Sequence, residues 1–174
     1  MTGPCFVDAD VFVYARDPRN TARQSRALHW IAHLWRERLG RTSVPVLSEY
    51  YVVATRKLKP QVASGAAWDD VQELMAWRPL PFDEALLRRA REIEQRWDLS
   101  WRGSMVVGAA QLQDCVLLLT EDLRDGAVFG GVTVRSAFTL SAEEQSAIYS
   151  VTPRARTRHR PRGRPRQLGQ AASA

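Results

Sequence analysis

The sequence predicts an α/β fold with a central, mostly parallel sheet of four to five short strands between two helical layers. Short apolar runs, such as Cys5–Val7 and Cys115–Leu119, alternate with longer stretches whose apolar residues recur at helical spacing. The chain has 174 residues with 45% hydrophobic content, which is enough for one domain with its own core. Alternating strands and helices favour a three-layer α/β/α arrangement with right-handed crossovers.

The first apolar run ends in acidic residues. Cys5–Val7 leads into Asp8 and Asp10, and a second apolar run follows at 11–13. We expect a buried strand, a carboxylate at its carboxyl end and a helix that starts at once, with Asp10 as a candidate cap of that helix. Open α/β sheets bind their ligands at such strand ends. An acid that closes an apolar strand must be solvated, paired or bound to a metal.

Caps, breakers and spacing predict the remaining elements. Helices are expected from Asn20 or Thr21 to about Leu39 with Gly40 as the stop, after Pro45 to about Leu58, over Val62–Trp77, from the cap Asp83 to Trp97, and from Ser100–Ser104 to Leu112. Further strands are expected at Arg41–Val44, Cys115–Leu119 and Val132–Val134, with an extended segment at Pro79–Pro81.

The net charge of +6 is concentrated near the end of the chain. Seven arginines stand at every second position there, and setting them aside leaves 18 of the 25 basic residues against 19 acidic ones. Such a Pro- and Gly-interrupted segment is typical of a disordered tail, which is either a solubilising appendage or an arm that binds phosphates non-specifically. We therefore predict a folded domain over 1–140, an extension over 141–152 and a tail over 153–174. The arginines are Arg154, Arg156, Arg158, Arg160, Arg162, Arg164 and Arg166.

Several protein classes lack support in the sequence. It contains no Gly-rich phosphate loop, no CxxC pair and no HExxH motif, and no apolar run approaches the roughly 20 residues of a membrane span. No basic and apolar leader opens the chain. Cys5 and Cys115 each begin an apolar run, which is typical of buried thiols in a reducing compartment. We expect a cytoplasmic protein that does not contact a membrane.

Three acids are predicted to meet at one edge of the sheet. Asp8 and Asp122 follow apolar strands, and Glu49 follows the strand expected at 41–44. Carboxylates about 5 Å apart repel by roughly 3 kcal/mol per pair at an effective dielectric of 20, so a close cluster needs a cation. Oxygen ligands suit Mg²⁺ or Mn²⁺, which could position a water for attack on a phosphodiester. The alternative is that these acids are simply solvated.

Five segments resemble, in order and spacing, the motifs of PIN-domain ribonucleases of the VapC toxin type. The resemblance spans about residues 4–140, and the segments are Phe6–Ala15, Val46–Glu49, Leu99–Ala110, Leu118–Leu123 and Gly131–Val134. It implies a PIN-like fold and a metal-dependent endoribonuclease of a type II toxin–antitoxin system. It also implies Mg²⁺ or Mn²⁺ as cofactor, RNA as substrate, a homodimer, and a cognate antitoxin that blocks the site.

The resemblance also assigns roles to individual residues. Asp8, Glu49 and Asp122 correspond to family acids and are the expected catalytic residues and metal ligands. The auxiliary candidates are Asp10, which replaces a common Asn, Thr120, which matches a hydroxyl near the metal, and Glu121.

One position departs from the family pattern. The third family acid is replaced by Gly103, beside Arg102. The chain is then either a naturally weakened nuclease or a toxin disabled by an Asp-to-Gly substitution. A second hypothesis is a PIN-fold module that binds antitoxin and RNA with weak or no catalysis. A third is a structure-specific nuclease acting on DNA, because an acidic site alone does not distinguish DNA from RNA.

Overall fold

The structure is a computed structural model that describes residues 3–139. Five strands form one sheet in the order β2-β1-β3-β5-β4. Neighbouring strands are parallel except β4, which runs antiparallel to β5. The predicted α/β class and mostly parallel sheet are therefore confirmed. The strands are β1 (Cys5–Val7), β2 (Gly40–Arg41), β3 (Leu117–Leu119), β4 (Val128–Phe129) and β5 (Val132–Arg135).

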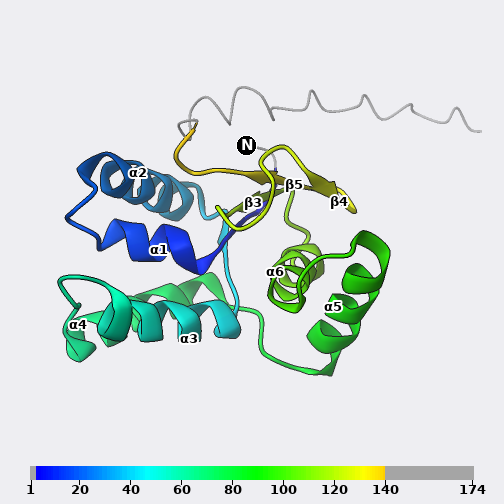
Figure 1. The fold of residues 1–174 in the computed structure, drawn as a ribbon, viewed down its shortest axis with the longest axis horizontal. Coiled ribbons are helices and arrows are strands. Elements are labelled where there is room, and N and C mark those ends of the chain that lie inside the picture. The colour runs from blue at the N-terminus through cyan, green and yellow to red at the C-terminus, as the bar shows by residue number, and fades with distance from the viewer. Residues whose placement is uncertain (1–2, 140–174) are drawn as a thin grey trace, which may run out of the picture.

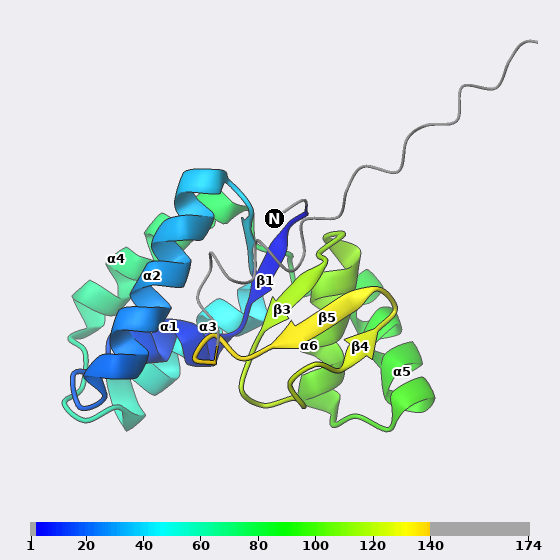
Figure 2. The same ribbon diagram turned by 90° about the horizontal axis from the view of Figure 1, so that it is seen from above.

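In the described part of the chain, six α-helices flank this sheet in two groups (Figures 1 and 2). Helices α1 to α4 lie on one side, and α5 and α6 pack against each other on the other side. Helix α3 continues into a π-helical turn at Val53–Lys57, and α4 into a 3₁₀ turn at Met75–Trp77. The helices are α1 (Ala9–Ala15), α2 (Thr21–Glu37), α3 (Val44–Val52), α4 (Ser64–Leu74), α5 (Glu84–Trp97) and α6 (Trp101–Leu112).

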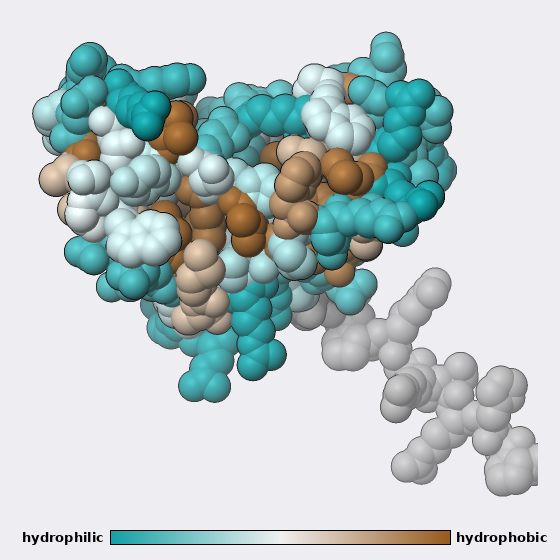
Figure 3. Space-filling model, turned by 90° about the horizontal axis from the view of Figure 1, so that it is seen from below, coloured by the Kyte–Doolittle hydropathy of each residue, from teal (hydrophilic) through white to brown (hydrophobic). Residues whose placement is uncertain are grey.

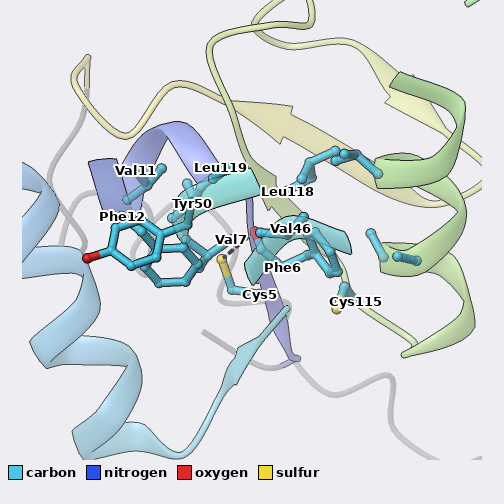
Figure 4. Packing of buried hydrophobic residues seen from close by; sticks show 14 of the residues in the cluster. Cys5, Phe6, Val7, Val11, Phe12, Val46, Tyr50, Cys115, Leu118 and Leu119 are labelled. Atoms are coloured by element: carbon cyan, nitrogen blue, oxygen red, sulfur yellow. Dashed lines mark hydrogen bonds between the residues drawn. The ribbon is translucent and has the colours of Figure 1, made fainter. Parts of the chain in front are cut away.

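The core lies around strands β1 and β3, whose side chains are buried along their whole length. Figure 4 shows Phe6, Val7 and Leu118 among the buried side chains contributed by the sheet and the helices around it. Phe12 of α1 meets Tyr50 of α3 edge to face, with ring centroids 6.1 Å apart. Strands covered by helices on both faces read as continuous apolar runs, which is why the sequence revealed them.

Polar residues begin the helices, although one cap differs from the prediction. Asp83 caps α5 as expected, and of the two candidates for α2 the cap is Asn20. Ser100, in the segment expected to start α6, caps that helix, and each of the three accepts a hydrogen bond from a backbone N–H of the first turn. Helix α1 begins two residues earlier than a cap at Asp10 requires. Its N-cap is Asp8, and Asp10 already lies inside the helix.

The segment around Gly40 also corrects the prediction. Helix α2 ends at Glu37 with Arg38 in the left-handed conformation, so Gly40 is not its stop but the first residue of strand β2. The indole of Trp77 lies so close that a Cβ at position 40 would be 2.5 Å from the ring. The strand expected at Arg41–Val44 is cut short because Val44 already belongs to α3.

Strand β4 has no counterpart in the predicted elements, because two residues are too short for a pattern. The expected extended segment at 79–81 does contact the sheet region through a bridge between Leu80 and Ser43. Within residues 3–139, no helix is long and apolar enough to cross a membrane. The predicted extension over 141–152 and the tail over 153–174 lie outside the described residues.

Candidate active site

Asp8 is the buried acid at the edge of the sheet where the parallel strands have their carboxyl ends. It follows β1 directly, and only 1% of the residue is exposed. Its Oδ1 accepts a hydrogen bond from the Ala9 N–H at 2.7 Å, and its Oδ2 accepts one from the Thr120 hydroxyl at 2.8 Å. Thus the carboxylate caps α1 and at the same time ties the end of β1 to the residue that follows β3.

Thr120 joins two of the predicted acids. Its hydroxyl is buried, donates to Asp8 and accepts from the backbone N–H of Asp122 at 3.1 Å. Because Thr120 follows β3, the parallel neighbour of β1, its side chain comes to the same sheet edge as Asp8. Its position fits the auxiliary residue that the sequence suggested.

The guanidinium of Arg102 lies among the three predicted acids. Arg102 occupies the first turn of α6. Its Nε donates to Oε2 of Glu49 at 2.9 Å, Nη1 donates to Oδ2 of Asp122, and Nη2 is 3.6 Å from Oδ1 of Asp8. The structure therefore brings the three acids together, as predicted, but around an arginine.

Burial and ion pairing shift the pKa values of Asp8 and Arg102. Burial raises the pKa of Asp8, while the charge of Arg102 and the hydrogen bonds from Ala9 and Thr120 act against that rise. Burial alone would lower the pKa of Arg102, but its hydrogen bond to Glu49 and the charge of Asp8 outweigh burial, so the pKa lies above its ordinary value. The guanidinium is a permanent cation in this site.

Asp10 and Glu121, the other auxiliary candidates, have partners other than Arg102. Asp10 accepts hydrogen bonds from the backbone N–H groups of Val11 at 2.7 Å and Glu121 at 2.6 Å. Burial, followed by the charge of Asp8, raises the pKa of Asp10 to about 8. The side chain of Glu121 lies 3.8 Å from the guanidinium of Arg23. Asp10 therefore fastens the 120–122 segment onto α1.

Gly103, where an acid was expected, is the third residue of α6. Its N–H donates to the Ser100 hydroxyl at 3.1 Å. A Cβ at this position would lie 3.2 Å from both Ser100 Oγ and Leu123 Cδ2. A side chain there therefore requires shifts of a few tenths of an ångström. Helix α6 thus starts in the segment where the sequence predicted it. The carboxylate that the family pattern has in this first turn is replaced by Gly103.

A comparison with protein families matches residues 5–126 of this chain to the PIN domain. The chain belongs to the PIN domain family, and the resemblance seen in the sequence is confirmed at that level. Among solved structures, it is similar to the sarcin-ricin loop cleaving toxin VapC20 of Mycobacterium tuberculosis, with 16% identity and a TM-score of 0.48. That alignment covers 68% of this chain and 89% of the other. A comparison with curated proteins gave no significant match.

The donor set does not fit the divalent ion that the sequence analysis anticipated. Within residues 3–139, no three acidic, histidine or cysteine side chains are arranged to hold a metal ion. The carboxylates of Glu49 and Asp122 point at different nitrogens of Arg102, and both oxygens of Asp8 already accept hydrogen bonds. Sequence reasoning identified the acids but missed the central position of Arg102. The sequence offered one signal for this position, because Arg102 directly precedes Gly103, where the family acid is missing.

Proposed function

We propose that this chain is an endoribonuclease toxin of a type II toxin–antitoxin system, of the VapC type, whose catalysis is impaired in the present sequence. The supporting observation is the grouping of Asp8, Glu49 and Asp122 around Arg102 at the carboxyl edge of a PIN-domain sheet. The reaction class is phosphodiester hydrolysis, in which water adds to phosphorus and the bond to a ribose oxygen breaks. PIN-domain membership supports RNA rather than DNA as the substrate.

The alternative is a PIN-fold module that binds antitoxin and RNA without efficient catalysis. A specific observation favours it, because Arg102 engages the acids that a nuclease of this type would direct at a cation. Gly103 removes a further carboxylate from the same edge. The two readings share fold, partners and location in the cytoplasm, and differ only in turnover.

An apolar groove of about 520 Å³ supports a protein partner. It lies between α1, α2, α3 and α4 and includes Phe12, Ile31 and Leu74, with Arg16 and Asp70 at its polar side. Apolar walls with a few polar groups at one side are typical of a binding site. We assign it to the cognate antitoxin, which would enter with an amphipathic helix or an extended segment.

Exposed apolar side chains support association of two copies. Val44 of α3, Phe82 before α5, Leu87 of α5 and Trp101 of α6 are each at least 38% exposed. Figure 3 shows apolar side chains gathered in the middle of one face, between two mostly hydrophilic flanks. Large exposed apolar patches mark interaction sites. We propose that this chain forms a homodimer.

The test is RNA cleavage by the native chain and by Gly103→Asp, each with Mg²⁺ or Mn²⁺. We expect the variant to cleave at least about tenfold faster, because a carboxylate at position 103 offsets the charge of the neighbouring Arg102 and adds an oxygen ligand to the site. Even groups that only support a metal ligand are worth about 10–100-fold. Asp8→Ala should abolish cleavage in both backgrounds. Equal rates for the native chain and Gly103→Asp, both sensitive to Asp8→Ala, would show that Gly103 is not a lesion.

A DNA substrate and an RNA-binding measurement distinguish the other two hypotheses from the ribonuclease. Structured DNA of matched length, in the same assay, tests the DNA-directed nuclease hypothesis, which predicts faster DNA than RNA cleavage. If neither protein cleaves RNA while both bind it, the non-catalytic binding module is the correct reading.

A further inference from the structure

Each nitrogen of the Arg102 guanidinium faces a different carboxylate. Nε bonds Glu49 of α3, Nη1 bonds Asp122 after β3, and Nη2 faces Asp8 at the end of β1. These three acids come from segments far apart in the sequence. A planar guanidinium is suited to such an arrangement because its donors form a rigid fork.

The buried acid makes this more than a surface ion pair. An exposed arginine–carboxylate pair contributes little to stability, and 38% of the Arg102 side chain is exposed. Asp8, however, is 1% exposed, and a buried carboxylate requires a compensating charge. Arg102 is the cationic side chain that forms an ion pair with Asp8 within residues 3–139.

The carboxylate oxygens of Asp8 and Asp10 already accept hydrogen bonds from other groups of the protein. Asp8 accepts from Ala9 and Thr120, and Asp10 accepts from the backbone of Val11 and Glu121. Mg²⁺ requires near-octahedral oxygen ligands at about 2.0–2.1 Å. The acids each face the guanidinium between them, and within residues 3–139 they do not form a group that could hold a metal ion.

Gly103, next to Arg102, also weakens the attraction of the site for a divalent ion. Gly103 supplies no carboxylate, and Arg102 adds a positive charge one residue earlier. Together, the three acids and Arg102 leave a formal charge of −2 at the centre. Loss of an acid and gain of a cation both lower the attraction for a divalent ion.

We propose that Arg102 is the resident cation of this site: it holds Asp8, Glu49 and Asp122 together from within the chain and excludes a divalent ion from the place between them. The native chain consequently keeps its carboxylate edge folded without metal and binds Mn²⁺ weakly there. Arg102 is a positioning residue, and its replacement opens the site to metal.

The test is Mn²⁺ binding by the full chain, followed by the electron paramagnetic resonance signal of free Mn²⁺. We expect Arg102→Met to bind one Mn²⁺ at least about tenfold more tightly than the native chain. Arg88→Met is the matched control, since Arg88 pairs with Glu84 at an exposed position of α5, and it should bind as the native chain does. Asp8→Asn added to Arg102→Met should abolish the new binding.

Thermal unfolding provides a second readout that involves no RNA, so its outcome is independent of whether the chain is a ribonuclease. In EDTA, Arg102→Met should unfold at a lower temperature than the native chain, and Mn²⁺ should raise the midpoint of the variant but not of the native chain. Equal Mn²⁺ affinity of the two proteins, or an equal rise in both midpoints, would overturn the proposal.

If circular dichroism shows that Arg102→Met does not fold, Arg102→Lys replaces it. Lysine keeps the charge but lacks the fork that serves three carboxylates, so Mn²⁺ should bind more tightly than to the native chain. Affinity equal to the native value would again overturn the proposal.

Discussion

Replacing Thr120 by valine removes the hydroxyl that joins Asp8 to the 120–122 segment while keeping the shape of the side chain. The lost bond is a 2.8 Å hydrogen bond to a buried carboxylate. Hydrogen bonds to charged groups contribute about 1.5–3 kcal/mol. The N–H of Asp122, which also loses a partner, belongs to a residue with an exposed side chain and can be hydrated instead. We therefore expect Thr120→Val to lower the free energy of unfolding by about 1.5–3 kcal/mol.

Urea unfolding followed by tryptophan fluorescence measures this loss. With a slope of about 2 kcal/mol per molar urea, the midpoint should fall by about 0.8–1.5 M. Thr120→Ser keeps the hydroxyl and loses only a methyl group, worth about 0.8 kcal/mol. Thr133→Val, in half-buried strand β5, controls for the general effect of the substitution. The reasoning is refuted if Thr120→Val costs no more than Thr120→Ser.

Two further predictions concern the tail and the thiols. If four or more of the tail arginines bind phosphates of single-stranded RNA, deleting residues 153–174 should change the slope of log K against log salt by roughly 3, at about 0.7 per contact; matching slopes for residues 1–152 and the full chain would exclude a role in RNA capture. Burial raises the pKa of Cys115 to about 12 and that of Cys5 well above its usual value. Both thiols should therefore stay protonated below pH 9 and react with Ellman's reagent only after denaturation; rapid labelling of the native chain at pH 8 would contradict this.

The sequence predicted the parts of the site that depend on strand position. Asp8 and Asp122 follow apolar runs, and parallel strands bring their carboxyl ends to one edge, so their proximity follows from the pattern. Glu49 was also placed correctly, although the strand before it proved to be only two residues long. The roles of these acids in catalysis stay a prediction.

The direction of the Arg102 side chain could not be predicted. A residue in the first turn of a helix points toward the sheet or toward solvent depending on how that helix sits, which the sequence pattern alone does not specify. Asp10 was expected as a cap for a similar reason. Asp8 and Asp10 can both cap a helix, and the sequence pattern does not specify at which residue the helix begins. Only the geometry of the chain between β1 and α1 makes Asp8 the cap.

The border of the sheet at strand β2 has a consequence for how copies of this chain can associate. Strand β2 lies at one border of the sheet, and β4 lies at the other, each two residues long. Exposed borders of a sheet recruit further strands, and proteins avoid this with short or covered border strands. The Trp77 indole lies over one face of β2. The backbone of Leu80 pairs with residues 42–44, directly after β2, so the border that continues from this strand is already occupied. An added strand would have to displace the Leu80 segment before it could extend the sheet there, so the border-to-border pairing that makes open sheets aggregate is hindered on this side.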